Sequence, residues 1–128
     1  MSYYFNKILN TDFDDAINRV TEALTKEGFG ILTEIDVKAT MKKKLDVDFR
    51  KYRILGACSP THAFRALTAE DKIGTMLPCS VIVQELGENM VEAAAIDPVA
   101  SMKAVQNSSL DPIALEVQSK LKRAIESL

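Results

Sequence analysis

The sequence predicts an α+β fold in which a mostly antiparallel sheet of about five strands packs on helices. Segments with strand and helix patterns alternate in the first half of the chain, whereas the second half groups two strands and then two helices. The short turn at Gly87–Asn89 is typical of a hairpin between those two strands. Grouped strands favour an antiparallel sheet over a regular βαβ repeat, and the expected order is β-α-β-α-β-α-β-β-α-α.

A change of periodicity marks the first strand and the first helix. Residues Tyr3–Leu9 are rich in aromatic and branched side chains, which favour a strand. Thr11-Asp-Phe-Asp14 then has the pattern of a capping box, which indicates a helix start. Gly28 is expected to end this helix, and residues 29–35 alternate in polarity as a second strand should.

The middle of the chain predicts two further helices and the third strand. Asp36 is expected to cap a short helix whose apolar residues fall four apart, with Lys42–Lys44 on its solvated side. Residues 52–58 are expected to form the third strand. A helix then follows over 60–69, with Ala63, Phe64 and Leu67 expected to face the core, and residues 73–76 are expected to form a loop.

The last third is expected to contain the hairpin strands 79–86 and 90–96 and two helices. Asp97-Pro98 and Asp111-Pro112 each predict a helix start, because proline costs little at the first helical position. Leu110 is expected to pack on Leu115. The predicted core consists of Phe13, Ile17, Val20, Leu24, Ile54, Phe64, Leu67, Val81, Val83, Val117, Leu121 and Ile125.

Length and composition predict a single domain over residues 1–128, large enough to bury a core without disulfides. The formal charge of −2 provides no general attraction to phosphate, so we expect no nucleic-acid partner. No apolar stretch approaches the length of a membrane span, and we expect a cytoplasmic protein without a membrane partner. In that compartment the two cysteines are expected to be free thiols.

The candidate site consists of Cys58, Ser59, His62 and Cys79. Cys58 ends a predicted strand directly before a helix start, where free amides and the helix dipole favour a thiolate. His62 is at the third helical position and leans back toward Cys58. The alternative is that both cysteines are small packed side chains and that the histidine faces water.

The spacing of these residues does not settle their chemistry. Cys58, His62 and Cys79 would supply three metal ligands without a fourth, in a spacing that is not typical of zinc sites, so we assign no metal. Cys58 and His62 are the residue types of a nucleophile and its base, yet the sequence provides no evident third group to orient the imidazole. No phosphate-binding glycine loop is present, and the sequence identifies no cofactor.

Three motifs resemble a known family. Tyr52-Arg-Ile-Leu-Gly-Ala-Cys-Ser-Pro60, Leu77-Pro-Cys79 and Asp97-Pro98 together resemble the bacterial and archaeal family called domain of unknown function 302. The resemblance implies one α+β domain with a curved antiparallel sheet, similar in fold to the TATA-binding protein. It implies no activity. Relatives often have Asn where this chain has Ser59 and Ser80, and part of the family lacks both cysteines.

Two classes of function are consistent with the sequence. The first is a non-catalytic binding or self-associating module, expected to be a homodimer because alternating apolar strands leave part of the sheet uncovered. The second is a thiol-based redox, metal or small-molecule site built from Cys58 and Cys79, with or without His62. For the second class we expect Cys58 and Cys79 to be neighbours on antiparallel strands, within reach of a disulfide, with Cys58 the more reactive.

Overall fold

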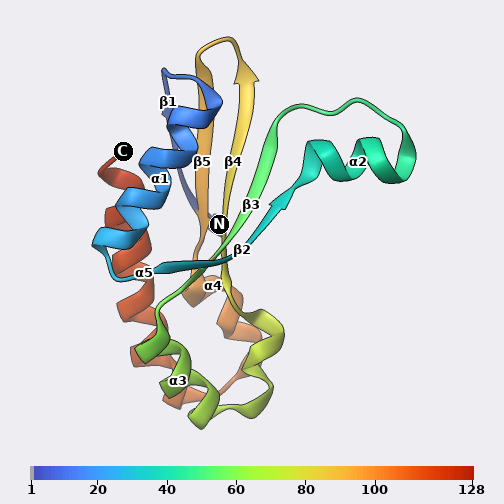
Figure 1. The fold of residues 1–128 in the computed structure, drawn as a ribbon. Helices are drawn as coiled ribbons and strands as arrows, with labels where there is room; N and C mark the ends of the chain where they lie inside the picture. The colour runs from blue at the N-terminus through green and yellow to red at the C-terminus, as the bar shows by residue number, and fades with distance from the viewer. Residues whose placement is uncertain (1) are drawn as a thin grey trace.

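A computed structural model describes residues 2–128 of the protein, and these residues form one antiparallel sheet with helices packed against it (Figure 1). The sheet contains β1 (Tyr4–Leu9), β2 (Gly30–Asp36), β3 (Tyr52–Cys58), β4 (Cys79–Gly87) and β5 (Met90–Ile96). The five strands lie in the order β1-β5-β4-β3-β2, and every neighbouring pair is antiparallel. The predicted class is therefore confirmed.

The helices follow the predicted order along the chain. They are α1 (Phe13–Lys26), α2 (Val37–Leu45), α3 (Pro60–Ala69), α4 (Pro98–Met102) and α5 (Asp111–Glu126). Three short 3-10 turns, η1 (Asp71–Met76), η2 (Lys103–Val105) and η3 (Ser108–Leu110), complete the regular structure. None of the helices within residues 2–128 has both the length and the apolar character needed to cross a bilayer.

The core lies between one face of the sheet and the pair α1 and α5, which run side by side in Figure 1. Alternate residues of β4, such as Val81 and Val83, are fully buried on this face. Leu24 of α1 and Leu121 of α5 are also fully buried against it. Most of the predicted core is confirmed, because the period of 3.6 in the helices and of 2 in the strands identifies the buried faces.

Four predicted core residues are not fully buried. Phe64 is 73% exposed and Leu67 is 44% exposed, whereas Ala66 of the same helix is buried. The small alanine lets α3 approach the core closely, and the bulky residues are thereby turned to solvent. Ile54 is only half-buried because it lies on the other face of the sheet from the core, and Ile17 packs at the core's margin.

The helix starts predicted from the sequence lie within about one residue of the starts in the structure. Helix boundaries are usually defined no more precisely than this. The α1 cap is Asp12, whose carboxylate accepts a hydrogen bond from the Asp15 amide at 2.8 Å, rather than Thr11. The predicted loop at 73–76 belongs to the 3-10 turn η1. Leu110 is buried, whereas Leu115 is 55% exposed, so of this predicted pair only Leu110 belongs to the core.

The helix α2 projects from the body of the fold at the far ends of β2 and β3 (Figure 1). Asp36 caps it as predicted, accepting a hydrogen bond from the Ala39 amide at 2.9 Å. None of its residues is buried, and Leu45 is 65% exposed. A helix of nine residues without a buried face receives little stabilisation from this chain.

Candidate functional site

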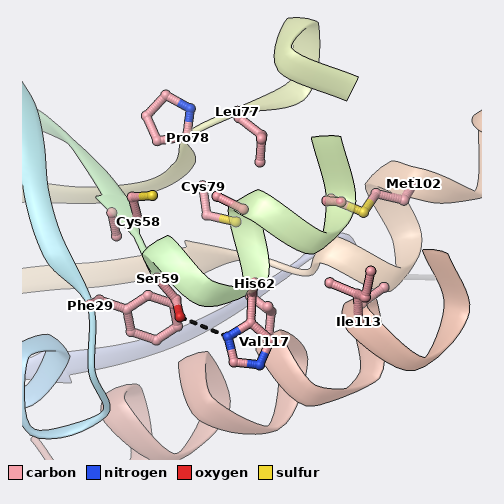
Figure 2. Close-up of a pocket in the computed structure, with 14 residues that line it drawn as sticks. Phe29, Cys58, Ser59, His62, Leu77, Pro78, Cys79, Met102, Ile113 and Val117 are labelled. Atoms are coloured by element: carbon pink, nitrogen blue, oxygen red, sulfur yellow. Dashed lines mark hydrogen bonds between the residues drawn. The ribbon is translucent and has the colours of Figure 1, made fainter. Parts of the chain in front are cut away.

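The predicted site residues gather around a small cavity where β3 passes into α3 and β4 begins (Figure 2). Cys58 is the last residue of β3, Ser59 is the N-cap of α3, and Cys79 is the first residue of β4. His62 lies one helical turn beyond Ser59. The structure therefore brings all four residues to one place.

The cavity is small and almost entirely apolar. Its volume is about 30 Å³, and its other walls come from distant parts of the chain, including Phe29, Met102 and Val117. A water molecule requires roughly 10 to 15 Å³ by this measure, so the cavity holds one or two groups of that size. It is too small to enclose a metabolite in this conformation.

The two cysteines are not a directly opposed pair. Strand β3 pairs antiparallel with β4 as expected, but Cys79 lies opposite Ala57, and Cys58 lies opposite Gly30 of β2. Both cysteines line the same cavity, but this offset of one residue means that they are not directly opposed across the two strands. Both cysteines are free, and the expected disulfide-ready arrangement is wrong.

The environment of the thiols favours their neutral form. Burial raises the pKa of Cys58, and it raises the pKa of Cys79 to about 11, with an added contribution from the neighbouring Cys58. Cys79 is 8% exposed, whereas Cys58 is half-buried. Burial therefore acts against the thiolate character that the sequence predicted for Cys58 at the helix start.

His62 is oriented by two hydrogen bonds and does not face open water. Its side chain is 13% exposed. The Nδ1 atom lies 2.7 Å from Ser59 Oγ, and the Nε2 atom lies 2.8 Å from Glu116 Oε2 of α5. Arg65 donates to the same Glu116 oxygen at 2.8 Å. The orienting group that sequence reasoning did not find is therefore Glu116, which is 54 residues away along the chain.

A second notable surface is the sheet face opposite the core, which we call the open face. Across four strands, Ile35, Ile54, Ile82 and Ala94 are directly opposed in one row. The neighbouring row joins Tyr52, Gln84, Glu92 and Ile8. A depression of about 360 Å³ on this face is lined by residues including Tyr4, Tyr52, Ile82 and Ile96.

The open face carries few charges, and these are internally paired. Glu92 accepts hydrogen bonds from Asn6 at 2.9 Å and from Gln84 at 2.7 Å. At the edge of the face, Arg50 donates to Gln84 at 2.8 Å and lies over the Tyr52 ring. One charge of each sign leaves this surface nearly neutral. In contrast, Lys42–Lys44 are exposed on α2, as the sequence predicted.

Within residues 2–128, no three His, Cys, Asp or Glu side chains gather in a way that would hold a metal ion.

Comparison with known proteins identifies the family. Residues 5–128 match the sequence model of the family described as "Domain of unknown function DUF302", and the chain belongs to this family. The fold is similar to that in the "Crystal structure of uncharacterized conserved protein DUF302 from Bacillus stearothermophilus", with a TM-score of 0.89 and 24% sequence identity over 98% of each chain. At this identity the likeness shows the fold alone. A search among curated proteins finds no match. The resemblance read from the cysteine motifs is thus confirmed.

Proposed function

We propose that this protein is a self-associating module that works as a homodimer, with the open face of the sheet as the dimer interface. The observation that carries the proposal is the row Ile35, Ile54, Ile82 and Ala94, which crosses four strands on the side opposite the core. Apolar rows of this extent are usually covered in soluble proteins, since exposed apolar surface is costly in water.

Electrostatics favour a second copy of this chain as the partner. In a dimer with two-fold symmetry the same patch meets itself, so an unbalanced charge would face a like charge. The open face has one acidic and one basic group, Glu92 and Arg50, and both are engaged in hydrogen bonds within the chain. A nearly neutral apolar surface tolerates pairing with itself and offers little to nucleic acid or to a strongly charged protein.

The projecting helix α2 adds to this argument. Leu45 and Val47 are 65% and 44% exposed at its end, and α2 itself has no buried residue. These side chains add apolar surface that the chain itself does not cover. The cytoplasm is the compartment we propose for the dimer, in keeping with its free thiols.

The alternative function, a thiol-based redox, metal or small-ligand site at Cys58, Cys79 and His62, has less support. The two cysteines are not directly opposed across β3 and β4, burial raises the pKa of both, and the cavity has room for only one or two small groups. These observations favour packed cysteines.

The variant Ile82→Lys tests the proposed interface. Ile82 is at the centre of the apolar row, and a dimer with two-fold symmetry would place two added charges near each other. Light scattering after gel filtration should then give the monomer mass of 14.1 kDa, whereas the wild type gives twice that mass. Leu115→Lys, which adds the same charge at an exposed position of α5, is the control and should stay dimeric. Equal masses for Ile82→Lys and the wild type would contradict the proposed interface.

A further inference from the structure

The side chains around His62 form a continuous hydrogen-bonded chain between α3 and α5. Ser59 Oγ lies 2.7 Å from His62 Nδ1, and His62 Nε2 lies 2.8 Å from Glu116 Oε2. Arg65 holds the same carboxylate oxygen at 2.8 Å. A hydroxyl, an imidazole and a carboxylate in this order are the groups of a serine nucleophile, its general base and the residue that orients the base.

The partners of His62 fix which nitrogen carries the proton. Hydrogen bonds from Arg65 and His62 lower the pKa of Glu116, so its carboxylate is ionised at neutral pH and can only accept. Nε2 must therefore donate to Glu116. In the neutral imidazole Nδ1 then carries no hydrogen, and it accepts the hydrogen bond from the Ser59 hydroxyl. This is the protonation state that a general base requires, because Nδ1 is ready to take the serine proton.

The Ser59 hydroxyl does not cap α3, and the first amides of α3 are not used in hydrogen bonds within the helix. A serine at the N-cap usually accepts a hydrogen bond from a first-turn amide, but Ser59 makes no such bond. Pro60 has no amide hydrogen, and the amides of Thr61 and His62 have no partner within the helix because of their position. These amides are donors of the kind that stabilise the oxyanion of an acyl-transfer intermediate.

We propose that Ser59 is a nucleophile, with His62 as its general base and Glu116 as a positioning residue, and that the site hydrolyses esters of a two-carbon acyl group. The size of the acyl group follows from the adjoining cavity, which is apolar, is lined by Ala63, Ala66 and Ile113, and has a volume of about 30 Å³. An acetyl group fits such a space and longer acyl chains do not. The alcohol part of the ester remains outside the cavity. The proposed dimer interface on the open face uses none of these residues.

The reaction proceeds in two balanced steps. Ser59 Oγ attacks the carbonyl carbon while its proton passes to His62 Nδ1. The ester bond to the alcohol then breaks, and the same proton goes to the leaving oxygen, giving free alcohol and acetyl-Ser59. In the second step water loses a proton to His62 and attacks the acyl carbon. Ser59 leaves and recovers the proton, and acetic acid is released.

The first experiment measures hydrolysis of p-nitrophenyl acetate by the full chain. Removal of the nucleophile in Ser59→Ala should lower kcat/KM at least about hundredfold, the scale of losses on removing a triad member. Ser109→Ala, which changes an exposed serine of η3, is the control and should keep the wild-type rate. p-Nitrophenyl butyrate should react at least about a hundredfold more slowly than the acetate, since each of its two extra methylenes costs about tenfold. Equal rates for Ser59→Ala and the wild type would overturn the proposal.

The second experiment identifies the nucleophile in the wild-type protein by covalent labelling. A fluorophosphonate probe should modify the wild-type protein at Ser59, as located by peptide mass spectrometry. Glu116→Gln should slow this labelling and lower kcat with little change in KM, because it disturbs the orientation of the base and not substrate binding. Labelling absent from Ser59, or spread over other hydroxyls, would show that the hydrogen-bonded chain only joins α3 to α5.

Discussion

Ile54 and Ile82 lie directly opposite each other across β3 and β4, on the face of the sheet that is turned away from the core. The row continues to Ile35 on one side and to Ala94 on the other. Leu55 and Val81, the next residues along the two strands, are fully buried against the helices. The two faces of this sheet are therefore both apolar, but only one of them is covered within this chain.

Docking of the last helix is tested by Leu121→Ala. Leu121 of α5 is fully buried, and its truncation should lower the free energy of unfolding by about 2 to 5 kcal/mol through lost burial and a residual cavity. Leu115→Ala is the matched control because Leu115 is on the same helix and 55% exposed, and it should change stability by less than about 0.5 kcal/mol. Urea denaturation provides both values. Equal effects of the two substitutions would mean that α5 is docked differently.

The close packing around Gly56 predicts that a larger residue at this position destabilises the fold. A β-carbon at this position would collide with the Thr33 side chain on β2 and would lie 2.6 Å from Pro78 Cγ. Gly56→Ala should therefore destabilise the fold by about 1 to 3 kcal/mol, as overpacked substitutions do. Gly30→Ala, where a β-carbon meets nothing within 4 Å, should be nearly neutral. Thermal unfolding of the two variants separates these outcomes, and a stabilising Gly56→Ala would refute the packing described.

The thiols should differ in their rate of alkylation. Cys58 is half-buried and Cys79 is 8% exposed with a pKa raised to about 11, so iodoacetamide near neutral pH should label Cys58 first. Both should react more slowly than a small free thiol, because burial raises both pKa values. Mass spectrometry of timed digests gives the order. Faster labelling of Cys79 would contradict the burial of this residue.

The ion pair at Glu116 should contribute stability that depends on pH. Hydrogen bonds from Arg65 and His62 lower the pKa of Glu116 in the folded state, so its contribution is present above the pKa of an unfolded-state carboxyl group. The contribution is lost as the pH falls through the lower folded-state value. Glu116→Gln should thus be less stable than the wild type at pH 7 and should approach it in acid. Glu22→Gln, on the exposed side of α1, is the control. A difference that stays constant with pH would argue against the ion pair.

The fold class could be predicted from the sequence because helix periodicity and turn residues are signals that lie close together along the chain. The periodic spacing of Val20, Leu24, Val117 and Leu121 identified the buried faces of two helices, and the hairpin turn before Met90 identified the antiparallel pair β4 and β5. The predicted orientation of α3 was wrong: Ala66 is buried, and Phe64, two residues earlier and therefore on the opposite side of the helix, is 73% exposed.

The candidate site was only partly predictable. Cys58, Ser59 and His62 are close in sequence, so their proximity follows from a strand that ends at a helix start. Glu116 reaches His62 only because α5 packs beside α3, and nothing in the sequence specifies that contact. Whether Cys58 and Cys79 are directly opposed depends on the β3–β4 register, and the structure has this register shifted by one residue from a direct pairing of the two.

The mass of the wild-type protein in solution tests the central claim most directly. Sedimentation equilibrium across micromolar concentrations should give a species of twice 14.1 kDa that dissociates only on dilution, because burial of the apolar row around Ile54 and Ile82 drives two copies together. A single 14.1 kDa species at every concentration would contradict the proposal that the open face is a dimer interface.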